Sequence, residues 1–358
     1  MTPETKALSR RYLDEVIESG VCSGMRVSAP EGGKFLQLLE AEYRSLFGVP
    51  YAVACNSATS GLHMALVAAQ VSPGSTVLVS GISMSASGAA VHHADCHPYY
   101  IDTDPETGLV TLETIMEAYQ EAKDEMIAPP SAIIIVHLFG QVFPFIPELR
   151  AAFPHMKIIE DCAQSPACVD NDARFSGTLG DVGVFSLNQH KVVQCGEGGV
   201  CVTEDKKIYE RLMWVRNHGE NYTSEIVGYN YRMTELEAAV AYAEVSELFA
   251  RQRARHAAAA YFYNRIQSLD GMKPGVAANP PFLLYLIDMG DDLRGAPPGW
   301  RRGYASPLCC IPGLKDRAGQ SCLLGAHEFN SRVLVHDPVE SLEEADKVAD
   351  ALLGVTVG

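Results

Sequence analysis

The chain has 358 residues, of which 47% are hydrophobic, and a formal net charge of −16. This length and apolar content suffice for a full α/β core and a smaller second domain. The strong negative charge argues against a nucleic-acid partner, because binding to phosphate backbones needs clustered Lys and Arg.

The N-terminal stretch, Met1 to Leu13, is polar and lacks an apolar signal region. No later segment approaches the roughly 18 uninterrupted apolar residues that a membrane span needs. We therefore expect a cytoplasmic protein with no membrane partner. Helical spacing of apolar residues then predicts helices over residues 4–20 and 34–47.

Residues 51–55 read as a short apolar strand, followed at once by small residues and a helix that runs to about Ala69. Strand, small-residue turn and helix together favour an anion site, because free backbone N–H groups and the helix dipole meet there. The hydroxyls of Ser57, Thr59 and Ser60 could add contacts to a phosphate. Taken alone, the same pattern also fits an ordinary Ser/Thr cap of a helix.

Strands and helices alternate through the next hundred residues. Strands are predicted at 77–80, 99–101, 132–136 and 157–160, with helices at 83–93 and 113–123. The alternation predicts a mostly parallel sheet. Asp161 and Gln164 follow one of these strands, at the sheet edge where ligands of open α/β folds bind.

The ten cysteines lie in apolar contexts without a C-x-x-C pair, which predicts reduced core residues. His93, Cys96 and His97 are close in sequence, but a structural zinc site wants four ligands and Pro98 ends the stretch. We expect no metal there.

Lys191 lies between a buried strand at 182–187 and the Gly196 to Gly199 turn, which leads into a strand at 200–203. A lysine held between two core strands is partly desolvated, which lowers its pKa and makes the neutral amine available as a nucleophile. A lone loop lysine is more often simply solvated. The surrounding motifs favour the functional interpretation.

The C-terminal part begins with helical patterning from Met233 to about Leu269. We place the domain boundary within it, giving a large domain at 1–245 and a small domain at 246–358. A strand is predicted at 282–287, followed by a short segment rich in Gly, Pro and Asp. Beyond it, Arg301, Arg302 and Tyr304 could contact an anionic substrate, although most surface arginines have no specific binding role.

Five segments occur in the order typical of a known enzyme family. They are Asn56-Ser57-Ala58-Thr59, Glu160-Asp161-Cys162-Ala163-Gln164, Phe185-Ser186 with Lys191 and Gly196-Glu197-Gly198-Gly199, Arg216-Asn217-His218-Gly219 and Asn230-Tyr231-Arg232-Met233. In these segments the chain resembles the DegT/DnrJ-type sugar aminotransferases, which are pyridoxal phosphate enzymes of the aspartate aminotransferase fold (fold type I). The likeness covers roughly residues 5 to 265, and several motifs in register make it specific. It implies a three-layer α/β/α large domain with a mostly parallel sheet and a smaller α+β domain.

The resemblance also implies roles. Lys191 would form the internal aldimine with the cofactor aldehyde, and Asp161 would face the pyridine nitrogen and keep it protonated. Gln164 would pack at the ring hydroxyl. The phosphate would be held by Ser57, Ala58, Thr59 and Ser186. Asn230 would reach the phosphate from the partner subunit, which makes a homodimer necessary.

The resemblance identifies substrate-binding residues less specifically, and the candidates are His190, Tyr231 and Arg232. Met84 stands where an aromatic ring usually stacks on the cofactor; its thioether can pack there more weakly. His137 and His92 are alternative side chains that could cover the cofactor ring.

The resemblance predicts amino transfer from glutamate or glutamine to a keto- or aldehydo-sugar, nucleotide-linked or free, in polysaccharide or antibiotic biosynthesis. Two alternatives stay open: a pyridoxal phosphate dehydratase or lyase, and a cofactor-binding sensor without turnover. Related dehydratases carry histidine in place of the lysine, so Lys191 favours the aminotransferase. A serine hydrolase and a Rossmann dehydrogenase are disfavoured, because neither G-x-S-x-G nor G-x-G-x-x-G is suitably placed.

Overall fold

The computed structural model describes residues 1–25, 29–125, 128–220, 226–267, 272–274, 279–288, 299–315 and 323–356. Within these ranges, none of the helices has both the length and the apolar character that crossing a membrane would require.

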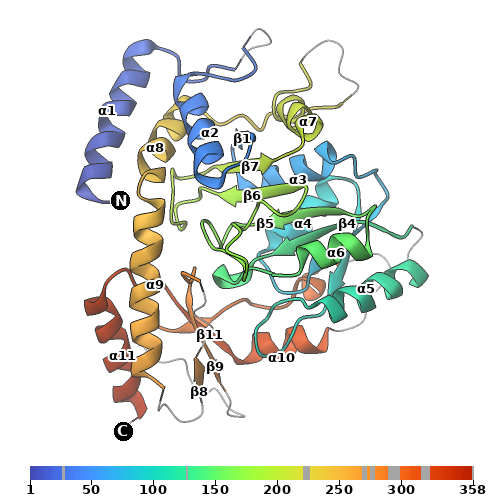
Figure 1. The fold of residues 1–358 in the computed structure, drawn as a ribbon, viewed down its shortest axis with the longest axis vertical. Coiled ribbons are helices and arrows are strands. Elements are labelled where there is room, and N and C mark those ends of the chain that lie inside the picture. The colour runs from blue at the N-terminus through green and yellow to red at the C-terminus, as the bar shows by residue number, and fades with distance from the viewer. Residues whose placement is uncertain are drawn as a thin grey trace.

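A seven-stranded sheet forms the centre of the molecule, in the order β1-β7-β6-β5-β4-β2-β3 (Figure 1). Neighbouring strands are parallel except where β7 pairs with β1 and β6. The strands are β1 (Tyr51–Cys55), β2 (Thr76–Ser80), β3 (His97–Ile101), β4 (Pro130–Val136), β5 (Lys157–Asp161), β6 (Val182–Ser186) and β7 (Gly199–Thr203). The predicted α/β class with a mostly parallel sheet is confirmed.

Successive side chains of each strand enter different helical layers, as the pleat requires. Ile134 of β4 joins the core cluster of helices α3, α4 and α7, whereas Ile133 and Ile135 join the cluster of α5 and α6. Near β1 the second layer is completed by α2 and α8. The helices of these layers are α2 (Lys34–Phe47), α3 (Ala58–Ala68), α4 (Ser85–His93), α5 (Leu112–Glu125), α6 (Ile146–Ala152), α7 (Lys206–Arg216) and α8 (Glu235–Val245).

Over its described residues, the patterned run that begins at Met233 contains two helices. After α8 the chain breaks at Ser246, whose hydroxyl donates to the Ala243 carbonyl at 3.0 Å, and α9 (Leu248–Arg265) follows. A serine side chain that bonds a nearby carbonyl competes with helical pairing, which explains a break that apolar spacing does not reveal. In Figure 1, α8 and α9 form a column beside the sheet, and α1 (Pro3–Ser19) lies against α8.

A second, antiparallel sheet lies at the lower end of α9, in the order β10-β11-β9-β8 (Figure 1). Its strands are β8 (Met272–Pro274), β9 (Leu284–Asp288), β10 (Arg301–Arg302) and β11 (Val333–His336). Helices α9 and α11 (Leu342–Thr356) pack around a cluster that includes Phe262, Trp300 and Leu352. The predicted strand at 282–287 is β9, shifted slightly. Most of the Gly- and Pro-rich segment after it lies outside the described residues, and the domain boundary near 246 stays a prediction.

A buried ion pair ties α2 to α7 and β1. The Arg216 guanidinium donates to Glu40 Oε1 at 2.6 Å and to the Ala54 carbonyl at 2.9 Å, and the same Glu40 oxygen accepts from Ala54 N. Arg216 is fully buried and Glu40 nearly so. Arg216 also donates to the Pro30 carbonyl at 2.9 Å, but Glu40 is the group that carries the opposite charge. Removing Arg216 would therefore leave the Glu40 charge in the core without its cationic partner.

We expect Arg216→Met to lower the free energy of unfolding by about 3–5 kcal/mol, measured by chemical denaturation, because Glu40 would stay buried without its partner. The exposed pair Lys34–Glu15 provides the control, since Glu15→Gln should cost about 1 kcal/mol or less. Equal losses in the two variants would contradict this account of the pair.

Candidate functional site

A cavity of about 680 Å³ opens at the carboxyl ends of β4, β5 and β6, between the two sheets. Nine of the twelve predicted site residues line it: Ser57, Ala58, Thr59, Met84, Asp161, Gln164, Ser186, His190 and Lys191. Segments that are more than a hundred residues apart therefore meet at one site, as expected from the position of these residues after parallel strands.

One end of the cavity is the N-terminus of α3. Ser57 is the N-cap, and its Oγ accepts from Ser60 N at 3.1 Å, so the capping interpretation is correct. The same turn faces the cavity, where the helix dipole favours a negative group. Gly199 lies directly behind it: a Cβ there would come within 2.7 Å of Ala58 N, so the approach of β7 to this turn requires glycine.

Asp161 is the acid of the site. It ends β5, is only 6% exposed, and lines the cavity. Its Oδ2 accepts from Ser87 Oγ at 2.8 Å, and its Oδ1 accepts from Ala163 N at 3.1 Å. These bonds orient the carboxylate and leave lone pairs for a further donor, since a carboxylate has about four acceptor positions.

A hydrogen bond between Gln164 and Tyr304 links the segment after β5 to the segment after β10. Gln164 Oε1 accepts from Phe139 N at 2.9 Å, and its Nε2 donates to the Tyr304 hydroxyl at 2.7 Å. Burial raises the pKa of Tyr304 to about 12, so the phenol stays protonated. With its oxygen accepting from Gln164, the Tyr304 hydroxyl keeps its own proton available to a bound molecule.

The Lys191 amine lies at the cavity wall, with Nζ 4.3 Å from the centre of the Phe282 ring. Burial lowers the pKa of Lys191, and the negative charge of Asp161 opposes part of that shift. A lowered pKa increases the fraction of neutral, nucleophilic amine at neutral pH. The apolar run around Lys191 predicted this desolvation, but the contact with Phe282, which lies just before β9, was missed.

The loop that carries Lys191 is held from two sides. Its backbone closes through Lys191 N to the Asn188 carbonyl at 2.8 Å and Cys195 N to the Leu187 carbonyl at 2.9 Å. Arg251 of α9 donates to the Val192 carbonyl at 2.8 Å while it pairs with Glu244. These contacts fix the position from which the amine enters the cavity.

The lowered pKa of Lys191 makes a prediction for the protein without any ligand. The folded state disfavours the proton, so a destabilising contribution is present at neutral pH and disappears as pH rises toward the unfolded lysine value of about 10.4. Thermal unfolding should therefore show that Lys191→Met stabilises the protein at pH 7 and that the gain shrinks toward pH 10. Lys206→Met, on the surface, should show no such dependence. A gain independent of pH would contradict the desolvation of Lys191.

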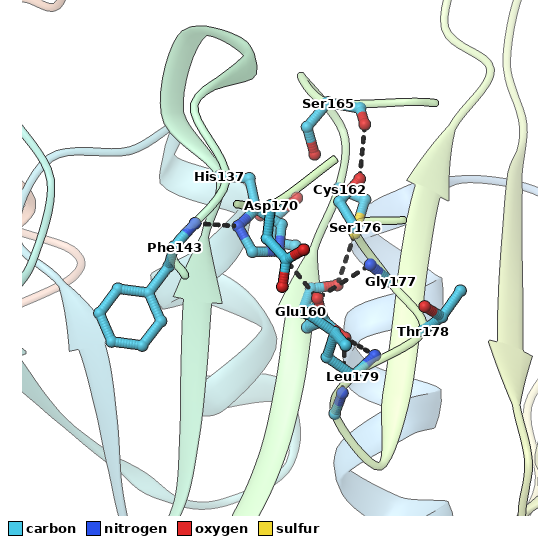
Figure 2. Close-up of polar contacts among 12 residues, drawn as sticks. His137, Phe143, Glu160, Cys162, Ser165, Asp170, Ser176, Gly177, Thr178 and Leu179 are labelled. Carbon is cyan, nitrogen blue, oxygen red and sulfur yellow. Dashed lines mark hydrogen bonds and ion pairs between the residues drawn. The ribbon is translucent and has the colours of Figure 1, made fainter. Parts of the chain in front are cut away.

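Behind Asp161, the neighbouring Glu160 points to the opposite face of β5 and anchors the surrounding loops (Figure 2). Its Oε2 accepts from His137 Nε2 at 2.9 Å and Gly177 N at 2.8 Å, and its Oε1 accepts from Leu179 N and Gly180 N. Although burial alone would raise the pKa of Glu160, the bond from His137 and the backbone N–H bonds hold it below its ordinary value.

His137 completes this anchor. Its Nδ1 accepts from Phe143 N at 3.1 Å, so the ring proton is on Nε2 and is donated to Glu160 (Figure 2). The residue is fully buried and does not line the cavity, and neither does His92. The expectation that one of these histidines covers the cofactor ring is therefore wrong, because the pleat of the sheet and the Glu160 contact direct His137 away from the site.

Glu160→Gln should lower the free energy of unfolding by about 3 kcal/mol at pH 7, because either amide orientation turns an NH₂ group toward backbone N–H donors. Stability supplied by a carboxylate of lowered pKa is lost as pH falls, so the difference between the two proteins should shrink below about pH 4. Denaturation across that range measures both effects. A pH-independent difference would contradict an ionised Glu160.

The other predicted residues do not line the cavity. Asn230 is exposed and forms a backbone bridge with Asn217. Tyr231 contacts His63 Nδ1 through its hydroxyl at 3.0 Å, and Arg232 donates to Asn217 Oδ1 at 2.7 Å. Their assigned roles toward cofactor and substrate stay predictions.

At the rim, Met84 is 59% exposed and precedes α4, so its thioether lies at the cavity opening. Arg301 lines the cavity and pairs with Asp337 at 2.8 Å, whereas Arg302 donates to the Ser331 carbonyl. Of the two arginines considered from sequence, Arg301 is thus the one placed to meet a bound molecule.

Comparison with known proteins identifies the class. Residues 12–286 match the model of the DegT/DnrJ/EryC1/StrS aminotransferase family. The chain belongs to this family of pyridoxal phosphate aminotransferases, and the predicted membership is confirmed.

Named relatives share about a third of the aligned residues. The chain is 32% identical to GDP-perosamine synthase of Caulobacter vibrioides, with 73% of this chain and 71% of the relative covered. It is 34% identical to UDP-N-acetyl-3-dehydro-alpha-D-glucosamine 3-aminotransferase of Acidithiobacillus ferrooxidans, with 67% and 64% covered. The aligned parts make up about two thirds of the length of these relatives.

Solved structures confirm the fold over nearly the whole chain. An aminotransferase of the same family from Brucella abortus has a TM-score of 0.85 at 24% identity and covers 98% of this chain and 95% of its own. NtdA from Bacillus subtilis, solved with bound PMP, has a TM-score of 0.85 at 20% identity and covers 100% and 83%.

Proposed function

We propose that this protein transfers an amino group from glutamate or glutamine to a keto- or aldehydo-sugar, with pyridoxal phosphate bound in the cavity between the two sheets. The observation that carries the proposal is the meeting of a desolvated amine, an oriented buried carboxylate and a helix N-terminus in one cavity. An amine, an acid and an anion site are the protein groups that this cofactor needs.

The residues present fit the cofactor. The α3 turn at Ser57, Ala58 and Thr59, together with Ser186, would hold the phosphate, and Asp161 has free lone pairs for the ring nitrogen. When bound, the cofactor supplies an electron-accepting ring. Lys191 would supply the amine for attachment, and Gln164 and Met84 would lie along the cavity wall beside the ring.

Asp161 and Lys191 would then hold and transfer protons. The Asp161 carboxylate would hold a proton at the ring nitrogen, because a nearby negative charge raises the pKa of a base. The Lys191 amine, with its lowered pKa, would take a proton at one carbon and return it at another, which is worth about 10²–10⁴-fold. Phe282 would exclude water, and the Tyr304 hydroxyl would donate a hydrogen bond to the acceptor.

The acceptor is proposed to be a nucleotide-linked keto-sugar. The names of the relatives at 32% and 34% identity support this class. A relative named L-glutamine:2-deoxy-scyllo-inosose aminotransferase, 31% identical, keeps a free cyclic ketone as an alternative. Arg301 at the rim is the group placed to meet a diphosphate, and Arg301→Ala should raise KM for the nucleotide-linked acceptor much more than for a free keto-sugar. Such sugars and glutamate are cytoplasmic pools, which supports a cytoplasmic location.

Two other functions remain as outcomes of the test. A dehydratase is disfavoured by lysine at position 191. A sensor without turnover is favoured by one relative, which is named a pleiotropic regulatory protein and is 30% identical.

Glutamate added to the holoenzyme should convert the cofactor to pyridoxamine phosphate and release 2-oxoglutarate in stoichiometric amount. A keto-sugar added next should become an amino sugar, which is the step that separates an aminotransferase from a dehydratase, because a related dehydratase has been solved with a PLP-glutamate adduct. Asp161→Asn should slow the conversion with glutamate by about 10²–10³-fold through loss of the charge. Asp172→Asn, an exposed carboxylate, is the matched control. Conversion without an amino-sugar product would leave the dehydratase, and no conversion with glutamate or glutamine would leave the sensor.

We further propose a homodimer whose active sites are shared, with Asn230 reaching the partner's phosphate. The support is its exposure and its distance from the cavity of its own subunit. Mixing inactive Lys191→Ala with inactive Asn230→Ala after unfolding and refolding should restore about a quarter of the activity, since half of the dimers are mixed and each has one intact site. Activity that stays at the level of the separate variants would contradict shared sites.

A further inference from the structure

A cluster of two thiols and an imidazole lies away from the cavity. The prediction that the cysteines are core residues holds for Cys55, Cys96, Cys162, Cys168 and Cys201, which are buried. Cys309 and Cys310 are only half-buried, in the short helix η2 (Leu308–Cys310). They face His327 of α10 (Leu324–Arg332), and the three possible ligand atoms lie within 4.8 Å of one another.

The distances suit one metal ion. Cys309 Sγ lies 3.8 Å from Cys310 Sγ, and Cys310 Sγ lies 3.2 Å from His327 Nε2. In a tetrahedral zinc site, bonds of about 2.3 Å to sulfur and 2.0–2.1 Å to nitrogen place two sulfurs about 3.8 Å apart and a sulfur about 3.5 Å from the nitrogen. The sulfur pair already has that separation, and the thiol–imidazole contact needs to open by only about 0.3 Å.

A second cluster of possible metal ligands in the described residues differs from this one. His137, Glu160 and Cys162 also lie within reach of one another, but all three are fully buried. Both oxygens of Glu160 already accept hydrogen bonds from protein donors, so that cluster has neither space nor lone pairs for an ion (Figure 2). The half-buried cluster is open to solvent on one side, which is what entry of an ion requires.

We propose that Cys309, Cys310 and His327 bind one zinc ion per chain, with water in the fourth position. Thiolate and imidazole ligands select zinc among the common divalent ions. Binding would displace the protons of the two thiols, which must be deprotonated to ligate. Sequence spacing gives no signal for this site, because the cysteines are adjacent and the histidine follows 17 residues later.

The ion would join two segments that each contact the end of a strand in the large sheet. Leu308 N donates to the carbonyl of Gly81, just after β2, at 2.9 Å. Gly325 N and Ala326 N donate to the two carboxylate oxygens of Asp102, just after β3. A metal between η2 and α10 would fasten these contacts together at the junction of the two sheets, a role that does not depend on the proposed amino transfer.

The test is metal binding by the full-length holoenzyme after dialysis against a chelator and a reductant. Added Co²⁺ should give thiolate-to-metal charge-transfer absorption that saturates at one equivalent per chain, and Zn²⁺ should abolish it. Cys310→Ser and His327→Asn should each weaken binding by at least about 100-fold, since loss of an outer-shell contact alone costs 10–100-fold. Cys195→Ser, another half-buried thiol, is the matched control and should bind like the wild type.

Zinc should also raise the unfolding temperature of the wild type and of Cys195→Ser, but not of Cys310→Ser or His327→Asn, with circular dichroism showing that all four are folded. Wild-type protein without the charge-transfer absorption would overturn the proposal. So would binding that survives unchanged in both ligand variants, because the ion would then be held elsewhere.

Discussion

Two neighbouring carboxylates at the end of β5 organise this molecule, because the pleat of the strand sends them to opposite faces of the sheet. Glu160 enters the helical layer of α5 and α6, where hydrogen bonds from four donors stabilise its carboxylate (Figure 2). Asp161 enters the cavity, where Ser87 and Ala163 orient it and leave it open to a ligand. One residue therefore fixes the backbone, and the next one offers an acid from that fixed position. A shift of one residue in register would exchange their roles.

The amine is positioned by different means. Lys191 lies on a loop, and loops are less rigid than strands. Here the loop is closed by its own backbone bonds and held by Arg251, while Phe282, just before β9, covers the amine. Because both Phe282 and Tyr304 come from the C-terminal part, the cavity is complete only when that part packs on the large sheet. The family model matches residues 12–286, so Tyr304 comes from beyond the matched part of the chain.

Much of this could be predicted from the sequence because the signals are local. Apolar runs followed by small or polar residues located the strands and the residues at their carboxyl ends, and order in the chain then placed Ser57, Asp161 and Lys191 at one edge. What could not be predicted depends on long-range packing. The break at Ser246 interrupts an otherwise continuous helical pattern, and the direction of His137 depends on Glu160, which is distant in sequence. Phe282 and the Cys–Cys–His cluster become visible only when the second sheet is folded against the first.

The central claim is that the amine of Lys191, and no other, carries the cofactor. Reduction of the purified holoenzyme with borohydride, followed by digestion and mass spectrometry, tests it directly. The account predicts a single pyridoxyl adduct on the peptide that contains residue 191 and none in Lys191→Ala. An unmodified peptide at that position, or an adduct on a different lysine, would contradict it.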